Sequence, residues 1–308
     1  MKILLIAGGW STEREVSLNG ARAMRETLEK RGHTVTFLDL RADFDRLLET
    51  ASHHDFALIN LHGRPGEDGL VQALLERVGC PYQGTGPAGS FLALNKCAAK
   101  QVFRYQGLPT ADWEFLPSPP PSNWRPSLPF PLFVKSNTGG SSLRTGRAAN
   151  MAELKSVCSP IFEAGDEVLL EPILHGREIT CGVLDETPLP PILIEPVSGD
   201  FFDYTSKYAT GGAREICPAP ISPELTCQVQ KLALAAHKAL DLRGYSRTDF
   251  ILSSSNTLTI LEINTLPGMT ATSLIPQEAA AIGLDFGQLL EKLIELGLEH
   301  FHAKRSSH

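Results

Sequence analysis

The sequence predicts an α/β domain at the N-terminus, followed by a larger part that mixes helices and strands as an α+β fold. Residues 2–7 (KILLIA) form a continuous apolar run, as in a strand that is covered on both faces. A helical pattern and two further strand-like runs follow, and this order predicts a parallel sheet with functional loops at its strand ends. The last third combines an amphipathic helix with two neighbouring strand-like segments.

The N-terminal elements follow from the spacing of apolar residues. Over residues 18–28 these residues recur every three or four positions, which predicts a helix that ends near Gly32. Residues 35–40 and 56–61 are predicted strands, and the second of them stops abruptly at His62. The loop that starts at His62 therefore lies where α/β sheets bind their ligands.

Proline dominates residues 116–131 (LPSPPPSNWRPSLPFP), so this stretch is expected to be a surface connection rather than a helix or a central strand. The remaining predicted elements are strands over 132–135, 167–171 and 178–184, a helix over 225–240, and a closing amphipathic helix over 286–300.

Composition narrows the class of protein. A length of 308 residues suggests two or three domains, and 28 basic against 35 acidic residues give a net charge of −7. Such a balance disfavours nucleic acid and membrane surfaces as partners, and no apolar stretch has the length of a membrane span. The first apolar run ends after seven residues without a cleavage-like site, so a buried strand is expected rather than a signal peptide. None of the six cysteines forms a CxxC pair, which is typical of reduced thiols in a cytoplasmic protein.

A loop of small residues follows the strand that contains Lys135 (VKSNTGGSSLRTG). Small residues let backbone N–H groups approach an anion closely, serines add donors, and the lysine adds positive charge. The pattern favours a loop that covers phosphates, although it lacks the GK[ST] ending of a P-loop. A plain surface turn is an equally good interpretation of this loop taken alone.

The segment RTDFILSSSNTLTILEIN predicts a hairpin with a four-residue loop and Leu252 opposite Thr257. Since side chains alternate along each strand, Arg247 and Asp249 then share a face with Glu262 and Asn264. Two carboxylates and a carboxamide are oxygen ligands that suit Mg²⁺ shared with substrate phosphates. The alternative is a solvated hairpin face with an incidental ion pair.

Two further polar segments follow predicted strands. GGWSTEREVS from Gly8 contains Glu13, which either complements a helix N-terminus or holds a substrate ammonium group. HGRPGEDG from His62 is equally compatible with a polar turn and with a ligand site.

Together these residues resemble the D-alanine–D-alanine ligases of the ATP-grasp superfamily, over nearly the whole chain. The motifs that carry the resemblance are GGWSTEREVSLNGA, HGRPGEDGLVQALLE, PYQGTG, the GGSS loop, EPILHGREIT, FDYTSKY, GYSRTDF and EINTLPGMTATSLIP. The resemblance implies a Rossmann-like N-terminal domain followed by a two-lobed ATP-grasp fold. The implied bounds are 1–94 for the substrate domain, 95–180 for the central lobe with the phosphate loop, and 181–308 for the lobe with the metal site.

The implied reaction is the ATP-dependent joining of two D-alanine molecules through an acyl phosphate, for peptidoglycan precursor synthesis. ATP and two Mg²⁺ (or Mn²⁺) ions would be required, the partners would be small molecules, and the family suggests a homodimer. The alternatives are a ligase for another amino acid or dipeptide on the same scaffold, and a nucleotide-binding homologue that has lost catalysis.

The resemblance also assigns roles to single positions. The implied catalytic positions are Glu13, Ser141, Tyr208, Arg247 and Gly268. Glu13 would hold the first substrate's ammonium group, and Arg247 with the Gly268 N–H would stabilise a tetrahedral oxyanion. The implied substrate-binding positions are His62, Lys207, Ser273 and Leu274. The implied ATP-binding positions are Lys96, Lys135, Ser142, Glu171, Leu174 and Glu178. The implied metal ligands are Asp249, Glu262 and Asn264.

Tyr208 bears on specificity, because relatives that make D-alanyl-D-lactate typically carry histidine in that loop. The tyrosine therefore favours an amine as the second substrate. The positions that depart from the family's usual residues are Gln83, Thr85, Asn95, Ser136, Arg144 and Pro172. Among them Arg144 stands where glycine is usual, so its long cation is expected to affect the phosphate loop most.

Overall fold

The N-terminal part is built on a three-stranded parallel sheet. Its strands are β1 (Lys2–Ala7), β2 (Thr34–Asp39) and β3 (Phe56–Asn60), in the order β2-β1-β3. Ile3–Ala7 of β1 and all of β3 are buried, as the continuous apolar runs predict. Its helical elements are α1 (Arg14–Lys30), α2 (Leu40–Asp43), the 3₁₀ helix η1 (Phe44–Arg46), α3 (Leu47–Ser52) and α4 (Leu70–Val78).

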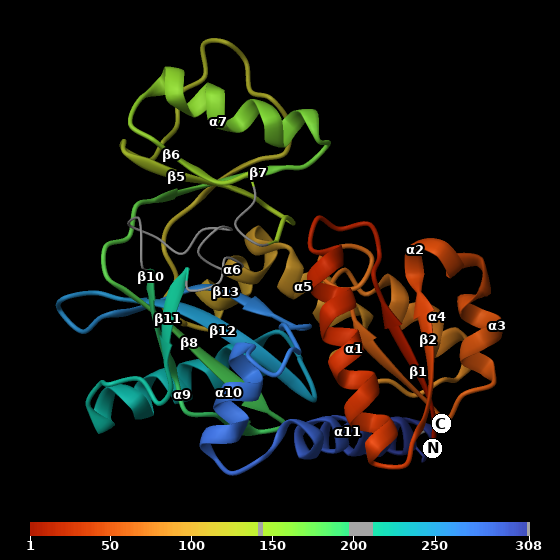
Figure 1. Ribbon diagram of the computed structural model, residues 1–308. Helices are drawn as coiled ribbons and strands as arrows, with labels where there is room; N and C mark the ends of the chain where they lie inside the picture. Colours follow the sequence, from red (N-terminus) through yellow and green to blue (C-terminus); the bar gives the residue numbers. More distant parts are fainter. Residues whose placement is uncertain (141–143, 197–211, 307–308) are drawn as a thin grey trace.

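The structure is a computed structural model that describes residues 1–140, 144–196 and 212–306. Two helices, α5 (Pro87–Leu94) and α6 (Lys96–Tyr105), lead from the first sheet into the central part. That part is a four-stranded sheet with helix α7 (Met151–Glu163) packed against it, at the top of Figure 1. In spatial order its strands are β4 (Glu114–Leu116), β7 (Val168–Pro172), β5 (Leu132–Ser136) and β6 (Gly146–Ala148).

An antiparallel sheet forms the C-terminal part. In spatial order its strands are β11 (Ala213–Ile216), β10 (Ile192–Pro196), β8 (Arg177–Leu184), β12 (Tyr245–Leu252) and β13 (Leu258–Asn264), and β9 (Thr187–Pro188) pairs with β8. Helix α9 (Pro223–Ala239) packs against β8 and β12. Helix α10 (Leu274–Ala281) also packs against β8. A parallel α/β sheet followed by two antiparallel sheets with packed helices confirms the predicted fold class.

The closing helix α11 (Phe286–Ser306) extends six residues beyond the predicted end at residue 300. It returns to the N-terminal sheet and contacts α1 and β3, as it does along the lower edge of the molecule in Figure 1. Leu289, Leu290 and Leu293 are fully buried there, in one apolar core with the strands of the first sheet. The apolar core around the first sheet is therefore completed by the last helix of the chain.

The hairpin of β12 and β13 differs in register from the prediction. Leu252 lies opposite Leu258 rather than Thr257, so the predicted register is wrong by one residue at the turn. A bulge at the Asp249–Phe250 step, opposite Leu261, then shifts the pairing by one more residue. Beyond the bulge Asp249 faces Glu262 and Arg247 faces Asn264, which confirms the predicted shared face.

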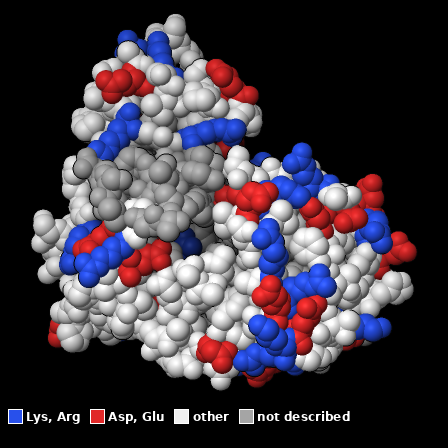
Figure 2. All heavy atoms as spheres, in the orientation of Figure 1, with Lys and Arg blue, Asp and Glu red and all other residues white. Residues whose placement is uncertain are grey.

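On the face shown in Figure 2, basic and acidic side chains are interspersed over the N-terminal part of the molecule. None of the helices within the described ranges has the combination of length and apolarity that crossing a lipid bilayer requires.

One buried histidine predicts how stability depends on pH. His237 lies on α9, its Nδ1 is 2.7 Å from Ser246 Oγ, and burial lowers its pKa from 6.5 to about 4. The unfolded chain therefore binds a proton below pH 6.5 that the folded chain excludes until about pH 4, so stability falls as the pH drops through this window.

At 1.36 kcal/mol per pKa unit, the free energy of unfolding falls by about 3 kcal/mol across this window. Urea unfolding at pH 7 and pH 4.5 should show that the free energy of unfolding falls less at the lower pH for His237→Gln than for the wild-type chain. Equal losses in both proteins would contradict a neutral buried His237.

Candidate functional site

The loops that follow β1 and β3 leave the sheet at one edge, because Ala7 and Asn60 are register partners. Ser17 on α1 fixes this edge: its Oγ accepts a hydrogen bond from Gly8 N (2.8 Å), and its carbonyl oxygen accepts one from Asn60 Nδ2 (2.7 Å). The loop after β1 thereby carries Glu13, and the loop after β3 carries His62, to the same side of the molecule.

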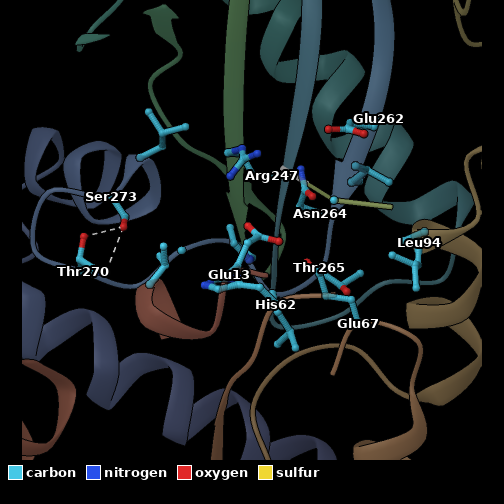
Figure 3. A pocket seen from close by; sticks show the side chains of 18 of the residues that line it. Glu13, His62, Glu67, Leu94, Arg247, Glu262, Asn264, Thr265, Thr270 and Ser273 are labelled. Atoms are coloured by element: carbon cyan, nitrogen blue, oxygen red, sulfur yellow. Dashed lines mark hydrogen bonds between the residues drawn. The ribbon is translucent and has the colours of Figure 1, made fainter. Parts of the chain in front are cut away.

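A cavity of about 400 Å³ opens at this edge. It is bordered by the two N-terminal loops, the start of α6, Gly139 and Gly140 of the predicted phosphate loop, and the C-terminal hairpin with the loop that follows it. Nine residues singled out from the sequence line it together: Glu13, His62, Lys96, Arg247, Glu262, Asn264, Gly268, Ser273 and Leu274. Figure 3 shows Glu13 and His62 reaching the cavity from the N-terminal side, with Arg247 and Asn264 on the strands above them.

Asp249 is the centre of a hydrogen-bonded group beside this cavity. Arg247 binds it through two parallel hydrogen bonds of 2.8 Å each, from Nε to Oδ1 and from Nη2 to Oδ2. Asn264 Nδ2 donates to Oδ2 (3.2 Å) and Thr180 Oγ1 donates to Oδ1 (2.6 Å). Burial acts to lower the pKa of Arg247, but the Asp249 carboxylate outweighs it and holds that pKa above its usual value.

These residues fit a divalent cation by the chemistry of their donors. Asp249 and Glu262 are direct register partners on adjacent strands, and Asn264 lies two residues from Glu262 on the same face. The hydrogen bond to Asp249 comes from the amide nitrogen of Asn264, which turns the amide oxygen away from that carboxylate. Two carboxylates and an amide oxygen make an all-oxygen set, of the kind that hard cations such as Mg²⁺ prefer.

Glu13, His62 and Glu67 form the acidic N-terminal wall of the cavity. Burial raises the pKa of Glu67 to about 8, the nearby Glu13 adds to the shift, and the hydrogen bond from Gly63 N to Oε2 (2.8 Å) opposes it. Burial lowers the pKa of His62, while Glu13 acts in the opposite direction. Near neutral pH this wall therefore combines a neutral imidazole with a largely protonated Glu67.

Lys96 joins the central part to the C-terminal hairpin. It is the first residue of α6, and its Nζ donates to Gly139 O (2.7 Å) and lies 3.3 Å from Glu262 Oε2. One ammonium group thus connects Gly139 of the predicted phosphate loop with the predicted metal ligand Glu262.

Lys135 and Glu171 belong to a buried ion triad outside the cavity lining. Lys135 Nζ lies 2.6 Å from Glu171 Oε2, and Lys100 Nζ lies 2.6 Å from Oε1. Burial acts to raise the pKa of Glu171, but the two lysines outweigh it and the pKa is lowered. The charge of Glu171 is therefore held from both sides, and Lys135 is fixed at the base of the predicted phosphate loop.

The other predicted ATP-binding residues lie farther along the chain. Leu174 is half-buried in the connection between β7 and β8, and Glu178 is half-buried on β8 opposite Ile251. Neither lines the cavity. Four predicted residues, Ser141, Ser142, Lys207 and Tyr208, lie outside the described residues.

The loop after β13 leads to the start of α10. Ser273 Oγ accepts a hydrogen bond from Thr270 N (3.0 Å) and lies 2.8 Å from Thr270 Oγ1, as the dashed lines of Figure 3 show. A Cβ on Gly268 would lie 3.1 Å from Ser273 Oγ, so a larger residue at 268 would press on this serine.

Arg144 departs from the family's usual glycine and adopts a φ of 53°. This left-handed region favours glycine, and a residue with a Cβ is disfavoured there by about 1–2 kcal/mol. The side chain is exposed.

Several residues that build the site were not predicted from the sequence: Glu67, Lys100, Thr180 and Glu278. Glu67 lies in the HGRPGEDG segment and could have been singled out there. Lys100 lies one helical turn after Lys96, a spacing that places two lysines on one helix face. Thr180 and Glu278 give no such signal, because their partners lie far away in the sequence.

Comparison with known proteins gives consistent matches. The family described as D-ala D-ala ligase C-terminus matches residues 96–295. A curated D-alanine–D-alanine ligase of Desulfovibrio desulfuricans is 72% identical over 298 residues, which is 97% of each chain, and one of Nitratidesulfovibrio vulgaris is 59% identical over 97% of this chain and 98% of its own.

Solved structures agree with these relatives. The D-alanine–D-alanine ligase of Bacillus anthracis complexed with ATP superposes with a TM-score of 0.87 at 35% identity, over 99% of each chain. The VanG D-Ala:D-Ser ligase of Enterococcus faecalis superposes with a TM-score of 0.80 at 28% identity, over 96% of this chain and 99% of its own.

Proposed function

The chain belongs to the D-alanine–D-alanine ligase family, and from this membership we propose how its cavity joins two D-alanine molecules at the expense of ATP for peptidoglycan synthesis. One observation supports the residue roles best. A single cavity holds an acid from the N-terminal part, Glu13, the guanidinium of Arg247, and the oxygen donors Glu262 and Asn264. These groups match the charges that the reaction creates.

The reaction has two steps. A carboxylate oxygen of the first D-alanine attacks the γ-phosphorus of ATP, and ADP leaves with the electrons of the broken bond. The amine of the second D-alanine then attacks the carbonyl carbon of the acyl phosphate, a proton leaves the nitrogen, and phosphate departs. Phosphoryl transfer needs mainly positioning and charge stabilisation, whereas the second step needs donors for the tetrahedral oxyanion.

The N-terminal wall would bind the first D-alanine. Glu13 lines the cavity beside a neutral His62 and a largely protonated Glu67, and its carboxyl group is the acid that we assign to the substrate ammonium. Arg247 on β12 and the backbone N–H of Gly268 would then receive the oxyanion. Asp249 holds the guanidinium plane by two hydrogen bonds, so the donor is oriented before the substrate arrives.

Lys96 and Lys135 would bind the ATP phosphates, Ser142 would add a donor from the phosphate loop, and Glu171, Leu174 and Glu178 would bind adenine and ribose. Asp249, Glu262 and Asn264 would hold two Mg²⁺ or Mn²⁺ ions. When bound, these ions would neutralise the charge of the transferring phosphoryl group.

Ser273 and Leu274 of the cavity lining, together with Lys207, would bind the second D-alanine, and Ser141 and Tyr208 would close the site over Glu13. We further propose the domain bounds 1–94, 95–180 and 181–308. A homodimer in the cytoplasm, where ATP is supplied, completes the proposal, with small molecules as its partners and no nucleic acid or membrane.

The proposal is tested by phosphate release from ATP and Mg²⁺ with D-alanine, beside L-alanine and a blank without amino acid. Mass spectrometry identifies the product. Release with D-alanine alone, accompanied by the dipeptide, is the expected result. ATP binding without phosphate release would instead favour a homologue that has lost catalysis.

Because the chain is also similar to a D-Ala:D-Ser ligase, the identity of the second substrate needs a direct assay. A single pocket residue changes preference between similar acceptors by about 10–200-fold. D-Serine and D-lactate therefore belong in the same assay. Efficient ligation of D-serine would move the assignment to another dipeptide.

The acceptor assay also tests the prediction for Tyr208. Tyr208→His is expected to raise the yield of D-alanyl-D-lactate relative to D-alanyl-D-alanine, because relatives that make the ester carry histidine in this loop. An unaltered ratio would show that the acceptor is selected elsewhere.

A further inference from the structure

A fully buried acid on α10, Glu278, is not used by the chemistry above. It lies one helical turn beyond Leu274, the first residue of this helix, and both Leu274 and the preceding Ser273 line the cavity. Its Oε1 accepts a hydrogen bond of 2.8 Å from Gly182 N on β8. The side chain therefore connects the helix that begins at the cavity with a central strand of the C-terminal sheet.

The position of Gly182 on β8 brings the Glu278 carboxyl group next to Arg247, the proposed oxyanion donor. Gly182 is the register partner of Arg247, and directly opposite residues project to the same face of a sheet. A Cβ on Gly182 would lie only 2.3 Å from Glu278 Oε2, so the carboxyl group occupies the volume of the missing side chain. Glu278 thus fills the space next to Arg247.

The hydrogen bond also completes the backbone of β8. The ladder between β8 and β10 covers Glu178, Ile179 and Thr180 and ends before Gly182. Beyond it, the carbonyl of Gly182 accepts a hydrogen bond from Leu189 N (2.8 Å), and its N–H is taken by Glu278. A buried backbone N–H without a partner is costly, so the carboxyl group supplies a needed acceptor.

The charge state points to a tether rather than a counter-ion. Burial raises the pKa of Glu278 to about 8, while the hydrogen bond from Gly182 and the charge of Arg247 oppose the shift. Its second oxygen, Oε2, is buried without a hydrogen-bond partner within the described ranges. Near neutral pH the group is therefore mostly uncharged, and its geometry matters more than its charge.

From these contacts we propose that Glu278 is a positioning residue for the second substrate, which it serves by tying the start of α10 to β8 beside Arg247. This inference rests on the proposed function, in which Ser273 and Leu274 bind the acceptor. Without the tether, α10 would lose its fixed distance from Arg247, so acceptor binding would weaken, while ATP binding, to which α10 contributes no residue, would not.

Three variants distinguish the effect of the hydrogen bond between Gly182 and Glu278 from the effects of the volume and the charge of the side chain. Glu278→Ala removes all three. Glu278→Gln keeps an oxygen acceptor for Gly182 N and nearly the same volume, but it cannot be charged. The double variant Glu278→Ala with Gly182→Ala refills the space from the strand side and leaves the tether absent, and the remaining neighbours of the new methyl group are the flexible ends of Ile275 and Leu189.

The assay measures KM for the second D-alanine and for ATP in each variant, with circular dichroism as the check of folding. Glu278→Ala and the double variant are expected to raise the acceptor KM about tenfold or more with an ATP KM within about twofold, as loss of one buried hydrogen bond implies. Glu278→Gln should stay within about threefold of wild type in both. If Glu278→Ala does not fold, the double variant and Glu278→Gln still make the comparison.

Three results would overturn the inference: an unchanged acceptor KM without the tether, an equal rise in both KM values, or a Glu278→Gln variant as impaired as Glu278→Ala. A wild-type chain that makes no dipeptide would instead overturn the proposed function, and the inference with it. The wild-type reaction in the same plate distinguishes the two failures.

Discussion

Replacement of Arg247 by alanine is expected to lower kcat by about 10²–10³-fold, the usual effect of losing one oxyanion donor. The guanidinium lies in the cavity and is oriented by two hydrogen bonds to Asp249, and no other cation on β12 or β13 can take its place. Binding of ATP should persist, because the lysines assigned to the phosphates lie on α6 and β5. Dipeptide formation and nucleotide affinity measured on the same preparation check both expectations.

The same change leaves the buried Asp249 without two of its four donors, so a folding control is needed. Loss of one partner of a buried pair costs about 3–5 kcal/mol, and thermal unfolding of the variant measures this cost. Arg25→Ala is the matched control, because Arg25 lies half-exposed on α1 and pairs with Glu29. A folded Arg247→Ala protein with normal turnover would refute the oxyanion role.

Glu262→Gln is expected to remove nearly all turnover at ordinary Mg²⁺ and to raise the Mg²⁺ concentration for half-maximal activity by at least about tenfold. The substitution keeps the shape of the side chain and removes one negative charge from an all-oxygen donor set. It also leaves Lys96 without its acidic neighbour 3.3 Å away. Mg²⁺ titrations of activity, with Mn²⁺ binding followed by electron paramagnetic resonance, report the metal directly.

Glu186→Gln is the control for Glu262, because Glu186 is exposed and its ion pair with Lys238 (3.1 Å) lies in solvent. Exposed pairs of this kind contribute little, so its Mg²⁺ dependence should equal that of the wild-type chain. Near-normal activity of Glu262→Gln at ordinary Mg²⁺, or weaker activity without any change in Mn²⁺ binding, would speak against the metal assignment.

The sequence predicts well what depends on local pattern. The apolar runs of β1 and β3 are buried on both faces, and their common edge brings Glu13 and His62 together as parallel strands require. The shared face of Asp249 and Glu262 is also predicted from strand alternation. Its register is not, because the turn pairs Leu252 with Leu258 and a bulge opposite Leu261 adds a second shift, neither of which strand alternation reports.

The site residues that could not be predicted are those whose contacts join residues far apart in the sequence. Glu278 reaches Gly182, and Lys100 reaches Glu171, over separations that no periodicity reports. A buried acid looks like a surface residue in the sequence, because its environment comes from a different element. The alanine-rich helix α10 around Glu278 gives no sign that one of its side chains ends at Gly182, the register partner of Arg247.

The position of α11 has a consequence for synthesis on the ribosome. Strands β1, β2 and β3 emerge first, yet Leu289, Leu290 and Leu293, which complete their apolar core, are translated last. The nascent N-terminal sheet therefore keeps an uncovered apolar surface while residues 61–285 are made, and such surfaces attract chaperones. A chain that stalls or is truncated before residue 286 would expose this surface permanently, so early termination should yield aggregates rather than a stable fragment.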